Sequence, residues 1–356
     1  MKLCVYSRKH LDDEAVLLTQ THNFAWLTSG RSFVAISSEN GVAAILVDSD
    51  QVKLITNNIE SQRLLDEELN SLPIDLHKCD WWQLDPISEA RKLIDPSKKL
   101  ILDTDSEYAS RFDMLRFTLT PYDVELYRSL GKDCGEIIGV VARATRPGMT
   151  EFDVAGHLSH ECLKRGIDAI VQLIAADDRI DTTRHPLPTH KRIEDRVMIV
   201  LCGRRNGLVL SVTRLVCFNA EAKNKIQPRH DAVTKVDAIA MHALKTGVSG
   251  ASIFKSIQQA YDDCGYPDEW KHHHQGGCAG YQSREWKATP SSTAQVAGSQ
   301  AFAWNPSIAG TKSEDTVLFH PDESIEVLST TLDWPMVMHT IDGKQYSRPD
   351  ILLLRV

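Results

Sequence analysis

The residues best suited to chemistry gather in five short segments of the second half of the chain. Their functional side chains are mainly imidazoles and cations, with few carboxylates, and the segments are Arg184–Pro186, Val200–Gly203, Gly207–Arg214, His273–Gly280 and Trp304–Asp315. A neutral imidazole accepts and returns a proton near neutral pH, so His185 and His273 are candidates for proton transfer. The guanidinium of Arg284 could bind a carboxylate or phosphate through paired hydrogen bonds. The pattern predicts proton-transfer chemistry on a small polar or anionic molecule.

Two further groups are weaker candidates. The run His272, His273 and His274 could hold an adventitious ion, but consecutive side chains rarely converge on one point, so polar surface is the expected reading. Cys202 would need an activating base to act as a nucleophile. Because strand residues alternate between faces, Leu201 and Cys202 are expected on opposite faces, so Cys202 would point away from a pocket if Leu201 faces it.

Short apolar runs separated by turn residues predict a mixed α/β first third. The expected strands are Phe33–Ile36, Ala43–Val47, Val52–Ile55 and Leu100–Asp103, and the expected helix is Ile59–Leu69. Pro121 is well placed to open a long helix from about Tyr122 to Ala144.

The rest of the chain contains an internal echo. Helix, turn and helix occur in residues 142–166 and again in residues 240–265, each followed by a β-rich stretch. In each copy a glycine, Gly148 or Gly247, permits a tight turn, and a hydroxyl, Thr150 or Ser249, follows where a helix N-cap is wanted. An α-then-β unit used twice predicts two similar halves around a pseudo-twofold axis, and ligand sites often lie between such halves.

The composition narrows the class of protein. The 356 residues are 42% hydrophobic and 25% charged, which is ample for a large core. A net charge of -8 argues against nucleic acid or an anionic membrane as partner. The sequence has no apolar run near the ~20 residues of a membrane helix and no apolar secretion signal at its start. The eight cysteines form no CxxC pair, so we expect reduced thiols in a cytoplasmic protein.

Three more motifs complete a resemblance to the creatinase/aminopeptidase P (pita-bread) superfamily. Asn23–Gly30 resembles its "N-x-x-Y-L-T-G" signature, Arg146–Glu151 its "PGMTE" turn and Gly310–Thr316 its "G-x-R-x-E-D-T" ending. The resemblance implies an α/β (α+β) fold. A creatinase-like N-terminal domain, residues 1–118, would precede a pita-bread domain, residues 119–356, with a curved antiparallel sheet and pseudo-twofold symmetry. It also implies a homodimer.

The resemblance also implies a dinuclear metal centre, but its ligand positions are degenerate here. The carboxylate and histidine positions fall at Leu201, Ser211, Gly277 and Asn305, and only Glu314 is retained. Divalent ions need several anionic oxygens, so the sequence predicts no metal and no other cofactor.

What the resemblance assigns instead is a metal-free site like that of creatinase. His185, His273 and Glu314 are the expected catalytic residues, and the expected substrate-binding residues are Arg31, Arg214, His274, Arg284, Glu285, Trp304, Asn305 and Lys312. Arg31 is expected to reach across a dimer. Plainer readings stay open: His185 as scaffold, Arg284 and Glu285 as a structural pair, and Arg31 as a solvated loop residue.

Three functions follow. The leading hypothesis is a metal-independent hydrolase of a C–N bond in a small polar, anionic or peptide-like substrate, with His185 activating water and His273 and Arg284 holding the carbonyl oxygen or a carboxylate. Glu314 would orient a histidine or bind a substrate amine. The alternatives are an inactive pita-bread binding protein and a metal-dependent Xaa-Pro peptidase. No nucleic acid or membrane partner is expected.

Overall fold

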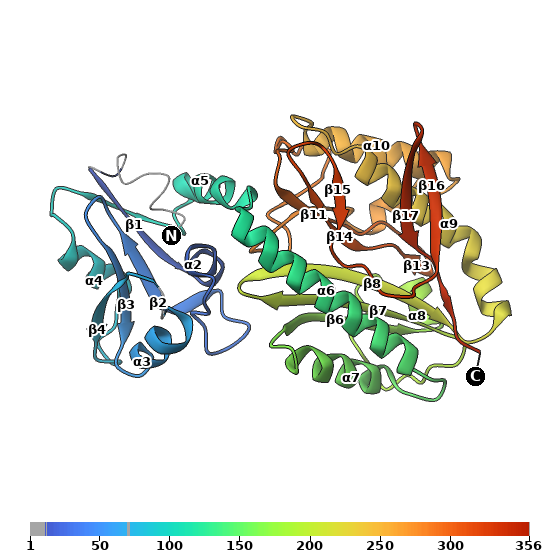
Figure 1. The fold of residues 1–356 in the computed structure, drawn as a ribbon, viewed down its shortest axis with the longest axis horizontal. Helices are drawn as coiled ribbons and strands as arrows, with labels where there is room; N and C mark the ends of the chain where they lie inside the picture. Colours follow the sequence, from blue (N-terminus) through green and yellow to red (C-terminus); the bar gives the residue numbers. More distant parts are fainter. Residues whose placement is uncertain (1–10, 12, 70–71, 356) are drawn as a thin grey trace. The chain divides into compact units, whose positions relative to one another are not determined.

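The structure, a computed structural model, describes residues 11, 13–69 and 72–355 (Figure 1). The chain divides into two compact units, one of residues 1–116 with 206–208 and one of residues 117–205 with 209–356. Within the described residues, none of the helices is both long and apolar enough to cross a membrane.

The first unit is built on a five-stranded mixed sheet with the order β4-β3-β2-β1-β5. Its strands are β1 Glu14–Gln20, β2 Asn40–Val47, β3 Val52–Asn57, β4 Asp75–Cys79 and β5 Lys99–Leu102. The pairs β1–β2 and β2–β3 are antiparallel, while β3–β4 and β1–β5 are parallel. Apolar side chains such as Leu17, Leu46 and Ile55 form its core, which supports the strands expected from their apolar runs.

Two expectations for the first unit need correction. Residues 33–36 form no strand, and Val34 and Ile36 are 68% and 48% exposed, so this apolar run is not buried in the sheet of the first unit. The helix expected over Ile59–Leu69 is a short α-turn continued by a π-helix. The helices of this part are α2 Thr21–Thr28, α3 Ser61–Arg63, π-helical η2 Leu64–Glu68, α4 Pro86–Leu93 and α5 Ser106–Phe117.

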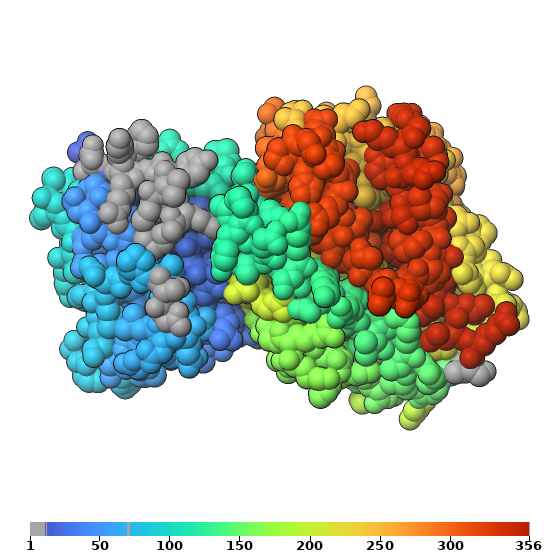
Figure 2. Space-filling view, in the orientation of Figure 1, coloured from blue at the N-terminus to red at the C-terminus, as the bar shows by residue number. Residues whose placement is uncertain are grey.

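The second unit contains two main sheets. One has the order β18-β8-β7-β6 and the other β10-β9-β11-β14-β15, with β12–β13 and β16–β17 as separate pairs. The hairpin β16–β17 lies on the surface of this unit, in red in Figure 2. The strands of the second unit are β6 Asp168–Ala176, β7 Arg196–Arg205, β8 Leu208–Cys217, β9 Gly276–Ala279, β10 Trp286–Lys287, β11 Gln300–Trp304, β12 Ser307–Ile308, β13 Thr311–Lys312, β14 Asp315–Phe319, β15 Ile325–Val327, β16 Met336–Ile341, β17 Lys344–Pro349 and β18 Leu352–Leu353.

Local sequence explains where the helices of the second unit begin. Thr120 caps α6 in a full capping box with Asp123, and Pro121 occupies the first turn. The expected long helix is confirmed to within one residue. The helices are α6 Pro121–Ala144, α7 Glu151–Leu163, α8 Asp178–Thr182, α9 Ala220–His242, α10 Gly250–Asp263 and 3₁₀-helical η3 Glu269–His272.

The internal echo is confirmed in the backbone. Gly148 and Gly247 have φ of 88° and 83°, in the region that favours glycine. Their N–H groups donate to the carbonyl oxygens of Ile193 and Val296 at 2.8 and 2.9 Å, so each turn is tied to its own half in the same way. The α-then-β unit therefore occurs twice, with antiparallel β7–β6 in the first half and β9–β11–β14 in the second. This is the mixed fold that the sequence predicted.

Candidate functional site

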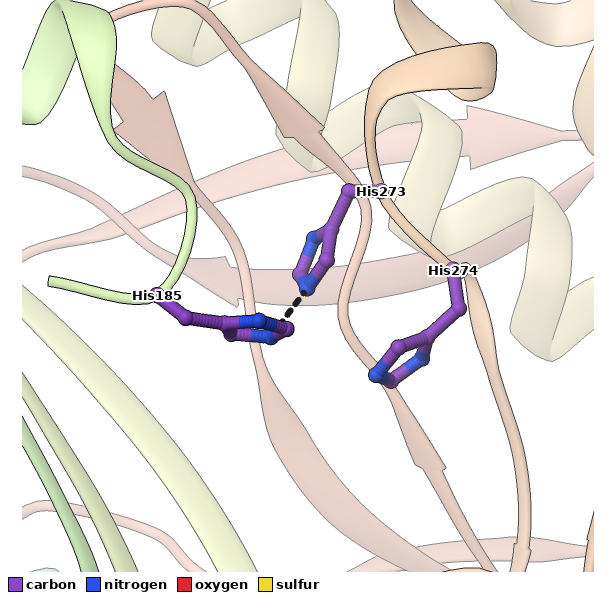
Figure 3. Close-up of side chains that lie close together, drawn as sticks. All are labelled: His185, His273 and His274. Carbon is purple, nitrogen blue, oxygen red and sulfur yellow. Dashed lines mark hydrogen bonds between the residues drawn. The ribbon is translucent and has the colours of Figure 1, made fainter.

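His185 lies on the segment between α8 and β7. Its neighbour Pro186 accepts a backbone hydrogen bond of 3.0 Å from Ile174 of β6, which ties the segment to the sheet. The residue is exposed, yet its Nε2 lies 3.2 Å from Nε2 of His273, 88 residues away (Figure 3). Partial desolvation of the ring, and then the charge of Lys312, lowers the pKa of His185, so its imidazole is neutral at pH 7.

His273 follows η3 and is only 7% exposed. Its Nδ1 lies 3.1 Å from Oγ of Ser307, and its Nε2 lies 3.3 Å from Nδ2 of Asn305. Asn305 is oriented by Arg284, whose Nη2 donates to Oδ1 at 3.4 Å, so the amide nitrogen faces His273. We therefore assign the ring proton of His273 to Nδ1 and the lone pair to Nε2.

This assignment changes the expected role of His273. Its Nε2 accepts the N–H of His185, and its Nδ1–H donates to Ser307. Burial and then Lys312 hold the pKa of His273 far below the usual value, so the ring does not gain a second proton at neutral pH. No N–H is left to hold a carbonyl oxygen. The geometry supports a positioning role, in which His273 fixes the ring of His185 and leaves Nδ1 of His185 unprotonated.

His274 completes a group of three imidazoles. Its ring centroid lies 4.8 Å from that of His273 and 6.0 Å from that of His185. Nδ1 of His274 is buried and has no hydrogen-bond partner in the described part of the chain. Burial, followed by the charge of Arg284, lowers the pKa of His274 to about 4. One ring nitrogen of each of the three histidines lies within 4.8 Å of the others. His273 and His274 therefore do converge with His185, although His272 is exposed, as expected for polar surface.

Arg284 lies beside this group with a side chain only 7% exposed. Its Nη1 donates to Oγ of Ser211 at 3.2 Å, and its Nη2 approaches Oδ1 of Asn305 at 3.4 Å and Oε1 of Glu314 at 3.3 Å. Its Nε is buried and has no hydrogen-bond partner among the residues that the structure describes. Because Asn305 contacts both His273 and Arg284, the histidines and the guanidinium belong to one site.

Glu314 is the one carboxylate of this site and is held by two cations. Its Oε2 lies 2.7 Å from Nζ of Lys312 and accepts a hydrogen bond of 2.6 Å from Thr213, while Oε1 faces Arg284. Burial opposes its ionisation, but Lys312 and then Arg284 outweigh burial and hold the pKa of Glu314 below its usual value. The expectation that Glu314 orients a histidine or binds an amine is wrong, because these three groups occupy its oxygens.

The residues present do not fit a pair of divalent ions. The positions derived from the resemblance supply a hydroxyl at Ser211, an amide at Asn305 and one carboxylate at Glu314. At Gly277 an added Cβ would lie 2.1 Å from the carbonyl oxygen of Trp286, so no ligand side chain fits there. Arg284 and the neighbouring lysine place two positive charges against the single carboxylate. A dinuclear centre needs several anionic oxygens, and this donor set lacks them.

The expected face of Leu201 is wrong. Asn206 and Gly207, with φ of 52° and 79°, form the tight turn of the β7–β8 hairpin and set Cys202 opposite Ser211, with Sγ and Oγ 3.3 Å apart. An added Cβ at Gly203 would meet Leu201 Cδ2 at 4.0 Å, so Leu201 points to the other side. The contact with Ser211 places Cys202 on the site face. Burial raises the pKa of its thiol, so the thiol stays protonated and unreactive.

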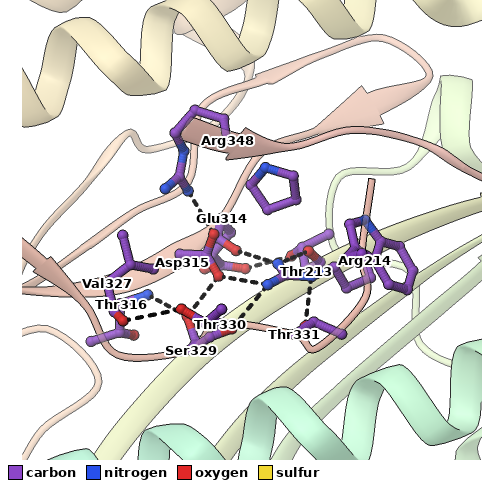
Figure 4. Close-up of polar contacts among 12 residues, drawn as sticks. Thr213, Arg214, Glu314, Asp315, Thr316, Val327, Ser329, Thr330, Thr331 and Arg348 are labelled. Atoms are coloured by element: carbon purple, nitrogen blue, oxygen red, sulfur yellow. Dashed lines mark hydrogen bonds and ion pairs between the residues drawn. The ribbon is translucent and has the colours of Figure 1, made fainter. Parts of the chain in front are cut away.

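Arg214 belongs to a different cluster, shown in Figure 4. Its Nη2 lies 2.9 Å from Asp315 Oδ1, its Nε donates to Thr331, and the residue is only 2% exposed. Arg348 bridges Asp315 and Asp237 at 2.7 and 2.8 Å. The expectation that Arg214 binds substrate is wrong, because these protein groups already occupy it.

Three other expected binding residues have local roles. Trp304 is fully buried and stacks on Phe302 with ring centroids 5.7 Å apart, so it belongs to the core. Glu285 accepts backbone hydrogen bonds from residues 281 and 282. Arg31 pairs with Glu68 at 2.8 Å within the first unit, and its reach across a dimer stays a prediction.

Sequence reasoning missed Ser307 and Thr213 as parts of the site. Ser307 Oγ contacts His273 and also accepts a hydrogen bond of 3.2 Å from Arg184. Thr213 donates to Glu314. Alternation along β8 from Ser211 would have placed Thr213 on the site face, whereas nothing in the sequence marks Ser307.

The comparisons with known proteins agree with this fold. The model of metallopeptidase family M24 matches residues 125–321, more than half of the chain. An uncharacterized peptidase of Staphylococcus haemolyticus is 21% identical over 87% of this chain and 93% of its own length. Among solved structures, an Xaa-Pro dipeptidase from Bacillus anthracis has a TM-score of 0.73 at 16% identity, covering 91% of this chain and 96% of its own.

Two further structures share the fold. The prolidase from Pyrococcus furiosus has a TM-score of 0.72 at 19% identity and covers 91% of this chain and 99% of its own. The N-terminal domain of the FACT complex subunit SPT16 from Cicer arietinum has a TM-score of 0.64 at 11% identity and covers 91% and 92%. At these identities the likeness shows the fold.

Proposed function

The chain belongs to metallopeptidase family M24, and from that premise we propose that it is a hydrolase that cleaves a C–N bond without the dinuclear metal centre. The substrate class is a small polar or anionic amide, amidine or peptide-like compound. The observation that carries the proposal is the contact between the two histidines, 3.2 Å from Nε2 to Nε2, beside a buried arginine whose Nε has no partner.

The reaction proposed for this site begins with proton transfer at His185. Because Nε2 of His185 donates to His273, Nδ1 carries the lone pair and accepts a proton from the attacking water. The same nitrogen returns the proton to the departing amine. Ser307 and Asn305 hold His273, which in turn holds the ring of His185.

Arg284 is the proposed anchor for substrate. Arg284 and Lys312 bring two positive charges, and Glu314 brings one negative charge, so this group carries a net charge of about +1. A substrate carboxylate or a developing oxyanion at Nε of Arg284 would be stabilised by that surplus. His274, whose Nδ1 also lacks a partner, is the second proposed contact.

The test uses protein treated with a chelator and a panel of N-acyl amino acids, Xaa-Pro dipeptides and guanidino acids, with amine release followed by mass spectrometry. We expect turnover in the wild type and in His272→Gln, and a loss of about 10²–10⁴-fold in His185→Gln. Equal turnover in His185→Gln would remove its role, and activity found only after addition of metal would support a metal-dependent peptidase instead.

A second candidate, a binding protein without catalysis, is favoured by one observation. Arg284 is held by Ser211, Asn305 and Glu314, so protein groups already fill the place where the family metals are expected. A binding protein without catalysis predicts no turnover of any compound in the substrate panel and no stabilisation by small molecules. A hydrolase predicts turnover and stabilisation by a small-molecule ligand.

A further inference from the structure

We propose that His185, His273 and His274 together bind one transition-metal ion such as Zn²⁺, at a place distinct from the ligand positions implied by the family. Three imidazoles with one open position form a known class of mononuclear zinc site. His273 is buried and His274 is half-buried, both on the segment that follows η3, and the exposed His185 comes from the segment between α8 and β7 (Figure 3).

The spacing of the ring nitrogens fits such an ion. With Zn–N bonds of ~2.0–2.1 Å, tetrahedral geometry places two ligand nitrogens roughly 3.3–3.4 Å apart. The Nε2 atoms of His185 and His273 lie 3.2 Å apart, and the ligand nitrogen of His274 lies within 4.8 Å of both. The third distance would have to close by rotation of the His274 ring, whose Nδ1 has no hydrogen bond to lose among the described residues.

The surrounding groups orient the ligands. Ser307 accepts the Nδ1–H of His273, and Arg184 fixes Ser307 by donating at 3.2 Å. A hydrogen bond from the ring nitrogen that does not bind the metal sets the tautomer of a ligand histidine and raises its basicity. On binding, the proton of His185 moves from Nε2 to Nδ1, and the 3.3 Å contact between Asn305 and His273 is replaced by the metal bond.

The charged groups near the three histidines decide the fourth ligand. Lys312, Arg284 and Lys287 are positive, and Glu314 is the negative group among those that act on His274. Repulsion from these positive groups lowers the affinity of the site for a divalent ion alone. An anion in the open position, such as hydroxide, chloride or a carboxylate, offsets this repulsion. The site is therefore one for a transition metal together with an anion.

The inference rests on the histidine geometry and not on the proposed hydrolysis. A bound ion would nevertheless affect the proposed hydrolysis. Metal binding at Nε2 places the ring proton of His185 on Nδ1, which is the atom that accepts a proton from water in the proposed reaction. Metal binding should therefore inhibit turnover.

The experiment measures the binding of Zn²⁺ to the protein by calorimetry and the binding of Co²⁺ by its visible absorption, both in chloride buffer. Another group, His77, Cys79 and Glu89, also has ligand atoms within 4.8 Å of one another, so all measurements use a His77→Gln background. His185→Gln, His273→Gln and His274→Gln test the ligands, and His272→Gln, an exposed neighbour, is the matched control. Circular dichroism shows whether each variant is folded.

We expect one equivalent of ion with a tetrahedral Co²⁺ spectrum in the background protein and in His272→Gln. Each of the three ligand variants should lose more than about 100-fold in affinity, since even losing a supporting hydrogen bond costs 10–100-fold. Unchanged affinity in the exposed-loop variant His185→Gln, or the absence of saturable binding in the background protein, would overturn the site. If the ion binds but activates turnover, the site stands and the metal-independent reaction fails.

Discussion

Two neighbouring carboxylates, Glu314 and Asp315, lie in two buried clusters of opposite character. Asp315 pairs with Arg214 and Arg348, and Arg348 also pairs with Asp237, so two positive and two negative charges balance. Glu314 alone faces Lys312 and Arg284, so one positive charge is in surplus. Among the described residues each cluster also holds one guanidinium nitrogen without a hydrogen-bond partner, Nε of Arg284 here and Nη1 of Arg348 beside Asp315. Balanced charge is what a structural network needs, whereas surplus positive charge favours the binding of an anion.

The largest expected effect is on stability. Arg214→Met leaves a carboxylate of the balanced cluster underpaired and should lower the free energy of unfolding by about 3–5 kcal/mol. Arg284→Met removes the surplus cation and leaves Glu314 paired with Lys312, so it should change stability by no more than about 1 kcal/mol. Denaturant unfolding of both variants measures the difference, and equal losses would contradict the distinction between the clusters.

The next effect is stabilisation by ligand. A small carboxylate that binds at Arg284 should stabilise the wild type by roughly 2.7 kcal/mol at a concentration 100 times its Kd. Thermal unfolding with N-acyl amino acids, dicarboxylates and guanidino acids measures this, and Arg284→Met should not respond. The same shift in both proteins would place the anion elsewhere, and the surface control His272→Gln should respond like the wild type.

The smallest expected effect is the pH dependence of the Glu314 cluster. Because the pKa of Glu314 is depressed in the folded state, its contribution is complete above the unfolded value of about 4.3 and is lost as pH falls through the folded value. Wild type and Glu314→Gln should thus differ in unfolding free energy at pH 7, and the difference should shrink as the pH falls below the unfolded value of about 4.3. A constant difference across this range would show that the carboxylate is not ionised in the folded protein.

The sequence predicted what local chemistry determines. Thr120, Pro121 and Asp123 define the start of α6, and the Gly148 and Gly247 turns define the two halves, because caps and turns depend on a few adjacent residues. It placed His185 and His273 in one site through motifs rather than through geometry.

What it could not give depends on register and long-range packing. The face of Leu201 was wrong because the hairpin register follows the Asn206–Gly207 turn and not the motif spacing. Arg214 and Arg284 are both arginines near motif residues, and only the three-dimensional partners separate the structural one from the one with a free nitrogen.

The close approach of the Trp286 carbonyl to Gly277 makes it hard to introduce a metal-ligand side chain at residue 277. Restoring acids at Ser211 and Asn305 requires only side-chain changes, but a histidine at 277 collides with the carbonyl of Trp286 at 2.1 Å. Stepwise reversion therefore meets a barrier in the main chain. An engineer who wished to rebuild a two-ion catalyst here would have to redesign the β9–β10 pairing first, and only then change the ligands.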